Sequence, residues 1–309
     1  MSGPDVGASV RQRLLNQSRV QERPFQELLQ YFAMERFLYR LSKSAFADRF
    51  VLKGALLLTA WRAPLSRPTM DIDLAGRTSN ELDHIAEIVR AVCSTVAEPD
   101  GIEFVPASIE ASRIREDADY GGVRVRFHAT LARARIPMQI DIGFGDVIMP
   151  APGELEYPTL LDFPAPVLHV YPKETVVAEK LEALTRLGLL NSRMKDYYDL
   201  ALLARMYPFE GEQLIAAIRA TFRHRGTRIE PEPVGLTAEY YEDPARALQW
   251  RAFVRRSRFT EQPDDLKQLV AEVRRFACPV LAAAVSAEQL AIGWSSGGPW
   301  ERSDAHRPL

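Results

Sequence analysis

The segment Phe50-Val51-Leu52-Lys53-Gly54-Ala55-Leu56 is followed by Arg67-Pro68-Thr69-Met70-Asp71-Ile72-Asp73-Leu74. Side chains alternate between the faces of a β-strand, so Asp71 and Asp73 are expected on one face and the apolar residues on the other. Neighbouring carboxylates repel unless a cation lies between them, and Mg²⁺ binds carboxylates, water and phosphates. The pattern favours a site for Mg²⁺ and a nucleoside triphosphate. A solvated strand face is the ordinary alternative for an isolated pair.

Lys53 and Gly54 form a predicted turn between a strand and the buried start of a helix at Ala55. Glycine lets backbone N–H groups approach a phosphate closely, and a helix N-terminus favours anions. Gly54 and Ala55 are therefore candidate phosphate contacts through their backbone N–H groups. A glycine that only the turn requires is the alternative.

A third candidate carboxylate, Asp141, lies in Ile136-Pro137-Met138-Gln139-Ile140-Asp141-Ile142-Gly143-Phe144. The even-numbered residues are apolar and share one face of a predicted strand, which leaves Gln139 and Asp141 on the other face. A buried carboxylate without a partner is costly, so Asp141 is expected to be paired or to bind a metal ion. Two acids on one strand and a third on a neighbouring strand fit two-metal phosphoryl transfer.

A further charged group lies in the second half of the chain. Lys180 falls in the middle of a predicted helix beside apolar residues, where its ammonium either reaches solvent or meets an anion. Asp196 and Asp199 share a face of the next predicted helix. Acids at the start of a helix also stabilise it through its dipole, and spacing alone favours that role.

Five motifs together resemble a known group of enzymes. Three are similar to the core motifs of the DNA polymerase β-type nucleotidyltransferase superfamily: Leu52-Lys53-Gly54-Ala55, Arg67-x-Thr69-x-Asp71-Ile72-Asp73-Leu74 and Ile140-Asp141-Ile142. Two more are Glu174-Thr175-x-x-Ala178-Glu179-Lys180-Leu181-x-Ala183-Leu184 and Arg193-x-Lys195-Asp196-x-Tyr198-Asp199-Leu200. With them, residues 50–203 resemble the AbiEii/AbiGii (MenT-like) nucleotidyltransferase toxins. This family usually has glycine or serine where this chain has Ala55, so no hydroxyl is available there for a phosphate.

The resemblance implies an α+β fold, in which a nucleotidyltransferase-type mixed sheet is flanked by helices and followed by a mostly helical C-terminal domain. It implies Mg²⁺-dependent nucleotide transfer from a nucleoside triphosphate. It assigns metal binding and catalysis to Asp71, Asp73 and Asp141, and a further catalytic part to Lys180 and Asp196. Contacts to the nucleotide are assigned to Lys53, Gly54, Ala55, Arg67, Thr69 and Asp199.

The resemblance also implies a biological role as the toxin of a type IV-like toxin–antitoxin pair. The acceptor would be RNA, the 3′ end of tRNA, so that transfer blocks translation, and a cognate antitoxin would be the partner. Two alternatives stay open at this point. The same fold supports transfer to a protein hydroxyl or a small molecule, and a non-catalytic nucleotide-binding protein would share the motifs.

Thr69 is a candidate regulatory residue because it lies two positions before Asp71. Phosphorylation there would add a charge of about −1.5 to −2 beside the acids and would compete with the triphosphate. The resemblance makes modification by a kinase antitoxin an expectation. The alternative is that Thr69 only hydrogen-bonds its neighbours.

Basic residues gather just before Asp141. In Val123-Arg124-Val125-Arg126-Phe127-His128, alternation places Arg124, Arg126 and His128 on one face. If this strand pairs with the Asp141 strand, its basic face lies beside the metal site, where a phosphate-rich substrate would pass. An ordinary exposed sheet face is the alternative.

Four segments are predicted along the chain: an N-terminal arm at residues 1–24, the nucleotidyltransferase core at 25–172, a helical domain at 173–292 and a C-terminal tail at 293–309. In the core, helices are predicted at 25–46 and 82–92 and three strands between 102 and 144. Six prolines between residues 150 and 172 indicate an irregular connection. Later helices are predicted at 174–187, 195–206, 212–222, 244–256 and 264–276.

Composition agrees with this organisation. The 309 residues are 47% hydrophobic and 26% charged, which suits a globular protein with room for two domains. The two cysteines exclude a disulfide framework. Neither an apolar run of membrane-spanning length nor a signal peptide is apparent, so no membrane partner is expected and the cytoplasm is the expected compartment.

Overall fold

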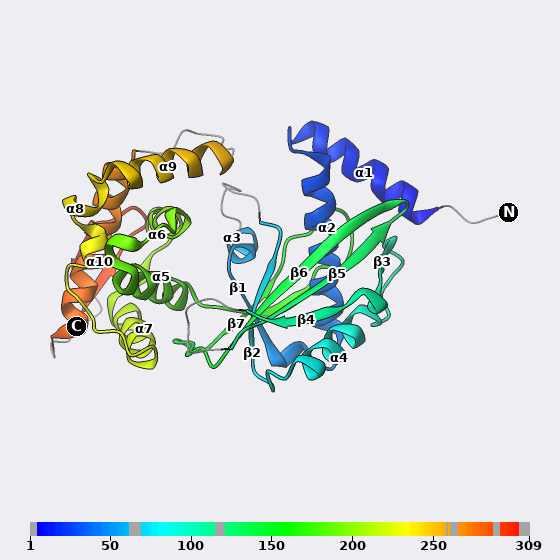
Figure 1. Ribbon diagram of the computed structural model, residues 1–309, viewed down its shortest axis with the longest axis horizontal. Helices are drawn as coiled ribbons and strands as arrows, with labels where there is room; N and C mark the ends of the chain where they lie inside the picture. Colours follow the sequence, from blue (N-terminus) through cyan, green and yellow to red (C-terminus); the bar gives the residue numbers. More distant parts are fainter. Residues whose placement is uncertain are drawn as a thin grey trace, which may run out of the picture. The chain divides into compact units, whose positions relative to one another are not determined.

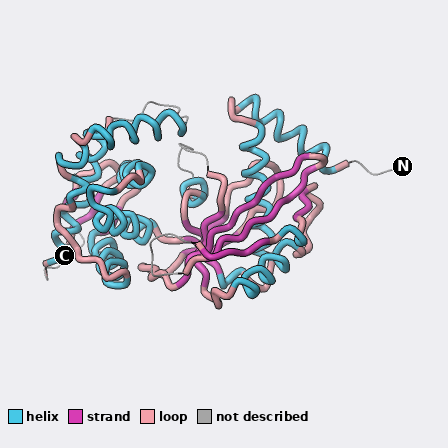
Figure 2. The backbone as a smooth tube through the Cα atoms, viewed as in Figure 1, coloured by secondary structure: helices cyan, strands magenta, loops and turns pink. Residues whose placement is uncertain are grey.

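The computed structural model describes residues 5–61, 69–114, 121–257, 259, 265–286 and 291–302. The chain divides into two compact units. Unit 1 contains the residues up to 146 together with 153–170, and unit 2 contains 147–152 and the residues from 171 onward. Figures 1 and 2 show a sheet with helices in unit 1 and a mostly helical unit 2. The domain limits expected from the sequence stay predictions.

The described strands of unit 1 form one eight-stranded mixed sheet, in the order β3-β5-β6-β2-β1-β8-β7, with β4 also paired to β5. The pairs β2–β6 and β1–β8 are parallel, and the other pairs are antiparallel. A mixed sheet flanked by helices confirms the predicted α+β class. The strands are β1 (Phe50–Lys53), β2 (Ile72–Gly76), β3 (Ile102–Phe104), β4 (Glu110–Arg113), β5 (Val123–Leu131), β6 (Ala134–Phe144), β7 (Gly153–Glu156) and β8 (Val167–Val170).

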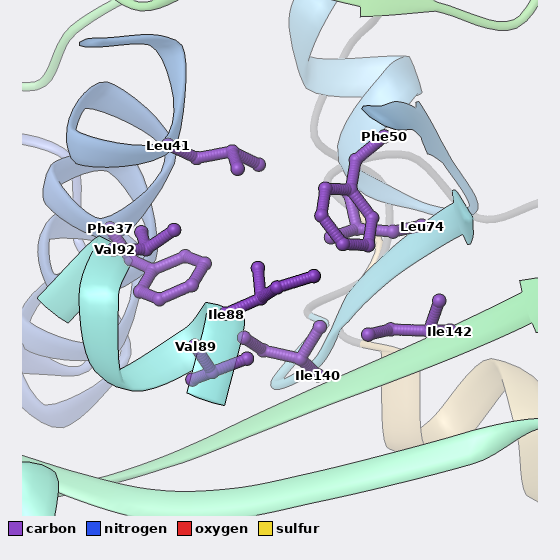
Figure 3. Close-up of a pocket in the computed structure, with 9 residues that line it drawn as sticks. All are labelled: Phe37, Leu41, Phe50, Leu74, Ile88, Val89, Val92, Ile140 and Ile142. Atoms are coloured by element: carbon purple, nitrogen blue, oxygen red, sulfur yellow. The ribbon is translucent and has the colours of Figure 1, made fainter. Parts of the chain in front are cut away.

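The apolar face of this sheet holds the core of unit 1. The helices of the unit are α1 (Val6–Val20), α2 (Phe25–Lys43), α3 (Leu56–Ala60) and α4 (Leu82–Cys93), with short 3₁₀ turns at Ala47–Arg49 and Pro106–Ser108. A small cavity lies between α2, α4 and the sheet (Figure 3). Its lining is wholly apolar: Phe37, Leu41, Phe50, Leu74, Ile88, Val89, Val92, Ile140 and Ile142. Because Leu74 and Ile140 alternate with Asp73 and Asp141, the candidate site lies on the opposite sheet face.

Helix α2 carries buried charges that connect three parts of unit 1. Arg36 and Arg40 both donate to Asp100, with Arg36 Nε–Oδ2 at 3.0 Å and Arg40 Nη1–Oδ2 at 2.7 Å. Glu35 accepts from the backbone N–H of Leu160 at 2.7 Å, and Arg36 donates to the carbonyl of Pro164 at 3.0 Å. These bonds fix the proline-rich connection against α2. They also satisfy polar groups that would be costly to bury alone.

Three segments differ from the sequence prediction. Residues 6–20 form helix α1 where an arm is predicted: Asp5 caps the helix by accepting from the N–H of Ala8, and Val10 and Leu14 are buried. The proline-rich connection contains β7 and β8, whose bonds come from the sheet and not from local sequence. In the predicted tail, Trp294 is buried and donates to the carbonyl of Ala204 at 2.7 Å, which anchors two short strands.

Unit 2 is mostly helical, as predicted. Its helices are α5 (Lys173–Leu187), α6 (Met194–Met206), α7 (Gly211–His224), α8 (Ala238–Tyr241), α9 (Pro244–Ser257) and α10 (Leu266–Val285), with 3₁₀ turns at Gly188–Leu190 and Val234–Leu236. A small sheet joins β9 (Phe209–Glu210), β10 (Ile292–Trp294) and β11 (Trp300–Arg302). Phe276 packs against Phe209 and Trp294, with ring centroids 5.0 and 5.1 Å apart. None of the described helices has the length and hydropathy needed to span a membrane.

Glu35 gives unit 1 a measurable pH dependence. Burial raises the pKa of its carboxyl from 4.5 to about 7. Between pH 4.5 and 7 the folded state keeps a proton on Glu35 that the unfolded state releases. The contribution of Glu35 to the free energy of unfolding is therefore present below about pH 4.5 and is lost as the pH rises through about 7. We expect Glu35→Gln to remove this loss. The measurement is urea unfolding from pH 4.5 to 8 for both proteins, with exposed Glu154→Gln as the matched control. An unchanged pH profile in Glu35→Gln would contradict the assignment.

Candidate active site

Four charged residues form one row across the polar face of the unit 1 sheet. Asp73 on β2 pairs in register with Asp141 on β6, and Lys53 on β1 pairs with Asp73. Arg124 on β5 pairs with Asp141 on the other side. Residues in register point to the same face, and adjacent strands lie about 4.8 Å apart. Two carboxylates are therefore neighbours, with a cation beyond each of them.

Arg124 holds Asp141 through both carboxylate oxygens. Its Nε donates to Oδ1 at 2.8 Å and its Nη2 donates to Oδ2 at 2.6 Å. A bidentate pair of this kind is stronger and more directional than a single charged hydrogen bond. Asp141 is thus paired, which is one of the two expectations from its apolar flanks. The basic strand pairs with the Asp141 strand, so the condition for its basic face to lie beside Asp141 is met.

Gly54 lies directly against Asp73. Its φ is +71°, and a Cβ atom built there would lie 1.9 Å from Asp73 Oδ2. Both the left-handed backbone and the close carboxylate therefore require glycine at this position. Ala55 follows and precedes α3, which has five residues. A helix this short has a small dipole, so a phosphate contact here would rest on the backbone N–H groups.

Lys53 has a partner that the sequence does not indicate. Its Nζ lies 2.6 Å from Oδ2 of Asp146, just beyond the end of β6. A Cβ at Gly143 would lie 3.0 Å from Lys53 Nζ and 3.1 Å from that oxygen, so glycine leaves room for the pair. In the sequence, Asp146 can be recognised only as an acid that follows a glycine at the end of a strand. That pattern does not indicate which lysine Asp146 contacts.

Asp71 lies before the strand on which it is predicted, because β2 begins at Ile72, and Thr69 also precedes this strand. The Thr69 hydroxyl donates to the carbonyl of Asp71 at 3.4 Å, and the Thr69 N–H donates to the hydroxyl of Tyr31 at 3.1 Å. This is the local bonding expected under the non-regulatory alternative, and modification of Thr69 stays a prediction. Arg67, the other candidate in this segment, lies outside the described residues.

Unit 2 has its own charged cluster, in which Lys180 on α5 meets two acids on α6. Lys180 Nζ donates to Asp196 Oδ1 at 2.7 Å and to Asp199 Oδ2 at 2.9 Å. Both acids are buried. The lysine therefore meets an anion instead of reaching solvent, and a cation between two buried acids offsets their repulsion. The structure brings these three candidates together, and their functional roles stay predictions.

The residues of unit 1 offer oxygen donors of the kind that Mg²⁺ prefers. Asp73 and Asp141 are in register, and Asp71 lies two residues before Asp73. Among the described residues, no three acidic, histidine or cysteine side chains are grouped closely enough to hold a metal ion. Both oxygens of Asp141 are engaged by Arg124. The carboxylates of Asp71 and Asp73 are of the chemical type that binds Mg²⁺ together with water and phosphate oxygens, and metal binding by Asp71, Asp73 and Asp141 stays a prediction.

Comparison with known proteins identifies the family. A family model described as "Nucleotidyl transferase AbiEii toxin, Type IV TA system" matches residues 36–272, more than half of the chain. The chain belongs to this AbiEii family. The match begins within α2 and ends within α10, so it includes both charged clusters. Membership of a type IV toxin–antitoxin family implies an antitoxin partner.

Two solved structures are similar to the AbiEii chain. JHP933 from Helicobacter pylori has a TM-score of 0.50 and 17% sequence identity, covering 84% of this chain and 93% of that one. A second H. pylori protein, a candidate nucleotidyltransferase by its description, has a TM-score of 0.45 and 16% identity, covering 85% of this chain and 98% of that one. The likeness to JHP933 shows a shared fold. Comparison with curated protein sequences finds no match.

The contact between Gly54 and Asp73 can be tested with a matched glycine. Gly54→Ala adds backbone strain and a Cβ that displaces the Asp73 carboxylate, whereas Gly226→Ala at φ +64° meets nothing within 4 Å. Both variants should lose about 1–2 kcal/mol from strain, and Gly54→Ala should lose more. Urea unfolding measures the difference. Equal losses in the two variants would show that Asp73 adapts freely to a side chain at position 54.

Proposed function

We propose that this AbiEii-family protein uses the row containing Asp73 and Asp141 to transfer a nucleotide from a nucleoside triphosphate to an RNA acceptor, the 3′ end of tRNA. The observation that carries the proposal is the pairing in register of two carboxylates on neighbouring strands, beside the turn at Gly54. Such a transfer would block aminoacylation and stop translation, which suits a toxin.

In the proposed reaction, the acceptor hydroxyl oxygen forms a bond to the α-phosphorus. The bond from that phosphorus to the bridging oxygen breaks, and pyrophosphate leaves with the electron pair. The hydroxyl proton passes to a carboxylate of the site or to water. Asp71 and Asp73 would hold Mg²⁺, which when bound offsets negative charge on the triphosphate. Gly54 and Ala55 would donate backbone N–H groups to phosphate oxygens.

Lys53, Arg124 and Asp141 would orient the reacting groups. Arg124 holds Asp141 in one orientation through its bidentate contact, and Asp146 does the same for Lys53. Ordered charges aimed at a reacting phosphate stabilise the charge that develops there without reorganisation. The exposed basic side chains next to Arg124 support RNA as the acceptor over a small molecule.

The direct test combines the purified protein with total tRNA, one labelled nucleoside triphosphate at a time, and either Mg²⁺ or EDTA. We expect label on tRNA with at least one triphosphate in Mg²⁺ and none in EDTA. Label on the protein or on a small molecule would favour the alternative acceptors. No transfer to any acceptor would favour a non-catalytic nucleotide-binding protein.

Asp73→Asn is the sharpest test of the carboxylate row. The amide keeps the shape of the side chain but removes its charge, so transfer should fall by at least about 100-fold, a loss typical of a preorganised charged group. Asp83→Asn makes the same change at an exposed position on α4 and should keep the wild-type rate. Initial rates of tRNA labelling measure both variants. A fully active Asp73→Asn protein would contradict the assignment.

Lys180 tests whether the unit 2 cluster acts in the reaction or only in stability. Lys180→Met removes the ammonium that bridges Asp196 and Asp199 and should cost about 3 kcal/mol of unfolding free energy. If Lys180 also contacts the triphosphate, KM for that substrate should rise at least about tenfold, the loss of one charge-assisted contact. Lys267→Met on α10 is the control. A stability loss with unchanged kcat and KM at a temperature where the protein is folded would make Lys180 structural.

A further inference from the structure

The polar face of the β5–β6 hairpin extends the charged row away from Asp141. Along β5 this face carries Arg124, Arg126 and His128, and across from them on β6 are Asp141, Gln139 and Pro137. The next pair is Thr130 and Arg135, and Arg133 lies in the turn. Figure 1 shows β5 and β6 as two long strands side by side. We name Arg126, His128, Arg133 and Arg135 the basic track.

The basic track is open to solvent on the side opposite the core. Arg126, Arg133 and Arg135 are exposed, whereas the alternate residues of both strands, such as Val125, are buried. Arg126 donates to Gln139 Oε1 at 3.1 Å, and Arg135 Nη2 donates to His128 Nδ1 at 3.3 Å. Neither contact neutralises a guanidinium charge. Within the described part of the chain, no carboxylate forms an ion pair with the basic track.

Described acidic residues of neighbouring elements lie near this face. Glu110 pairs in register with Arg126, Glu103 pairs with Thr130, and Asp5 caps α1 close to the turn. Glu110 and Glu103 belong to β4 and β3, which flank the hairpin only on the β5 side. The β6 side of the track carries no such acid between Arg135 and Gln139. The acids therefore border the track along its β5 edge, and this part of β6 adds none.

The spacing and side-chain types indicate the ligand. Alternate residues on a strand are about 7 Å apart, and the six steps from Arg135 to Asp141 span about 20 Å. The track is thus a line of arginines, with one histidine among them, that leads to the carboxylate row. The one aromatic ring on the polar faces of β5 and β6 is the imidazole of His128. A line of arginines with a single imidazole suits a phosphate backbone and gives little sequence preference.

We propose that the basic track binds the sugar–phosphate backbone of the RNA acceptor and leads its 3′ end toward the row of Asp73 and Asp141. The proposal rests on the proposed function and adds the surface that holds the substrate. Arg126 and Arg135 bind phosphates directly, and Arg133 extends the contact beyond the turn. Arg124, engaged by Asp141, marks the end of the track at the site.

The experiment compares two double variants that remove the same charge. Arg126→Gln/Arg135→Gln removes two cations from the track. Arg19→Gln/Arg90→Gln removes two exposed cations from α1 and α4 and is the control. Binding of fluorescein-labelled tRNA is followed by fluorescence anisotropy in EDTA without triphosphate, at several salt concentrations. Thermal unfolding confirms that both variants are folded.

We expect Kd of the track variant to rise about tenfold or more near 100 mM salt, with the control unchanged. The slope of log K against log salt should fall in magnitude by about 1.4 to 1.8, since each of the two lost phosphate contacts contributes about 0.7 to 0.9. In transfer assays KM for tRNA should rise while KM for the triphosphate stays constant. Labelled RNA oligomers of unrelated sequence should show the same loss.

The outcomes separate this proposal from the proposed function. Equal Kd values and salt slopes for the two double variants overturn the track as an RNA surface, even if tRNA is labelled. A wild-type protein that does not bind tRNA also overturns it. If the track variant loses tRNA binding but no transfer to RNA occurs, the track stands and the proposed reaction fails. If the track variant binds tRNA normally but no longer binds an acidic protein, the surface belongs to a protein partner and the proposal is overturned.

Discussion

The repulsion between Asp73 and Asp141 is the constraint on which the polar face of unit 1 depends. The two carboxylates are neighbours on parallel strands about 4.8 Å apart, and neither can be moved without changing the register. A slip of one residue would turn Asp141 into the apolar core and Ile140 to the polar face. The fold places a cation beyond each acid, Lys53 on β1 and Arg124 on β5. The charges of the row can therefore balance one another only when the strands have this order and this register.

The same constraint explains the small residues around the row. Gly54 leaves no space for a side chain beside Asp73, and Gly143 leaves space for the Lys53–Asp146 pair. These glycines give up the packing that a side chain would contribute and leave room for charged groups instead. Ion pairs that are partly exposed contribute little to stability, whereas a fixed array of charges costs no reorganisation when a phosphate arrives.

The buried charges on α2 have a different purpose. Arg36 is fully buried, and its partners come from Asp100, Glu35 and the carbonyl of Pro164. Apolar residues of the same volume would stabilise such a core at least as well. What the bonds add is a defined position for residues 160–164, a connection rich in proline and poor in regular structure. Because β8 follows that connection and pairs with β1, the position of Lys53 and Gly54 depends on it.

The local pattern of the sequence predicts the amphipathic elements and the strand faces on which acids lie, because both follow from spacing along one strand or helix. The helix at 82–92 and the faces of Gln139 and Asp141 are of this kind. Contacts between residues that are distant in the sequence cannot be predicted from local spacing. Nothing near Lys53 indicates Asp146, and β7 and β8 form in a segment that its prolines mark as irregular, because their bonds come from the sheet. Helix α1 has only a short apolar stripe, so its stability as a helix comes from the packing of residues such as Val10 and Leu14. The strand positions of Asp73 and Asp141 can thus be predicted from the sequence, but the cations beside them and the strand edges that support them depend on the complete sheet.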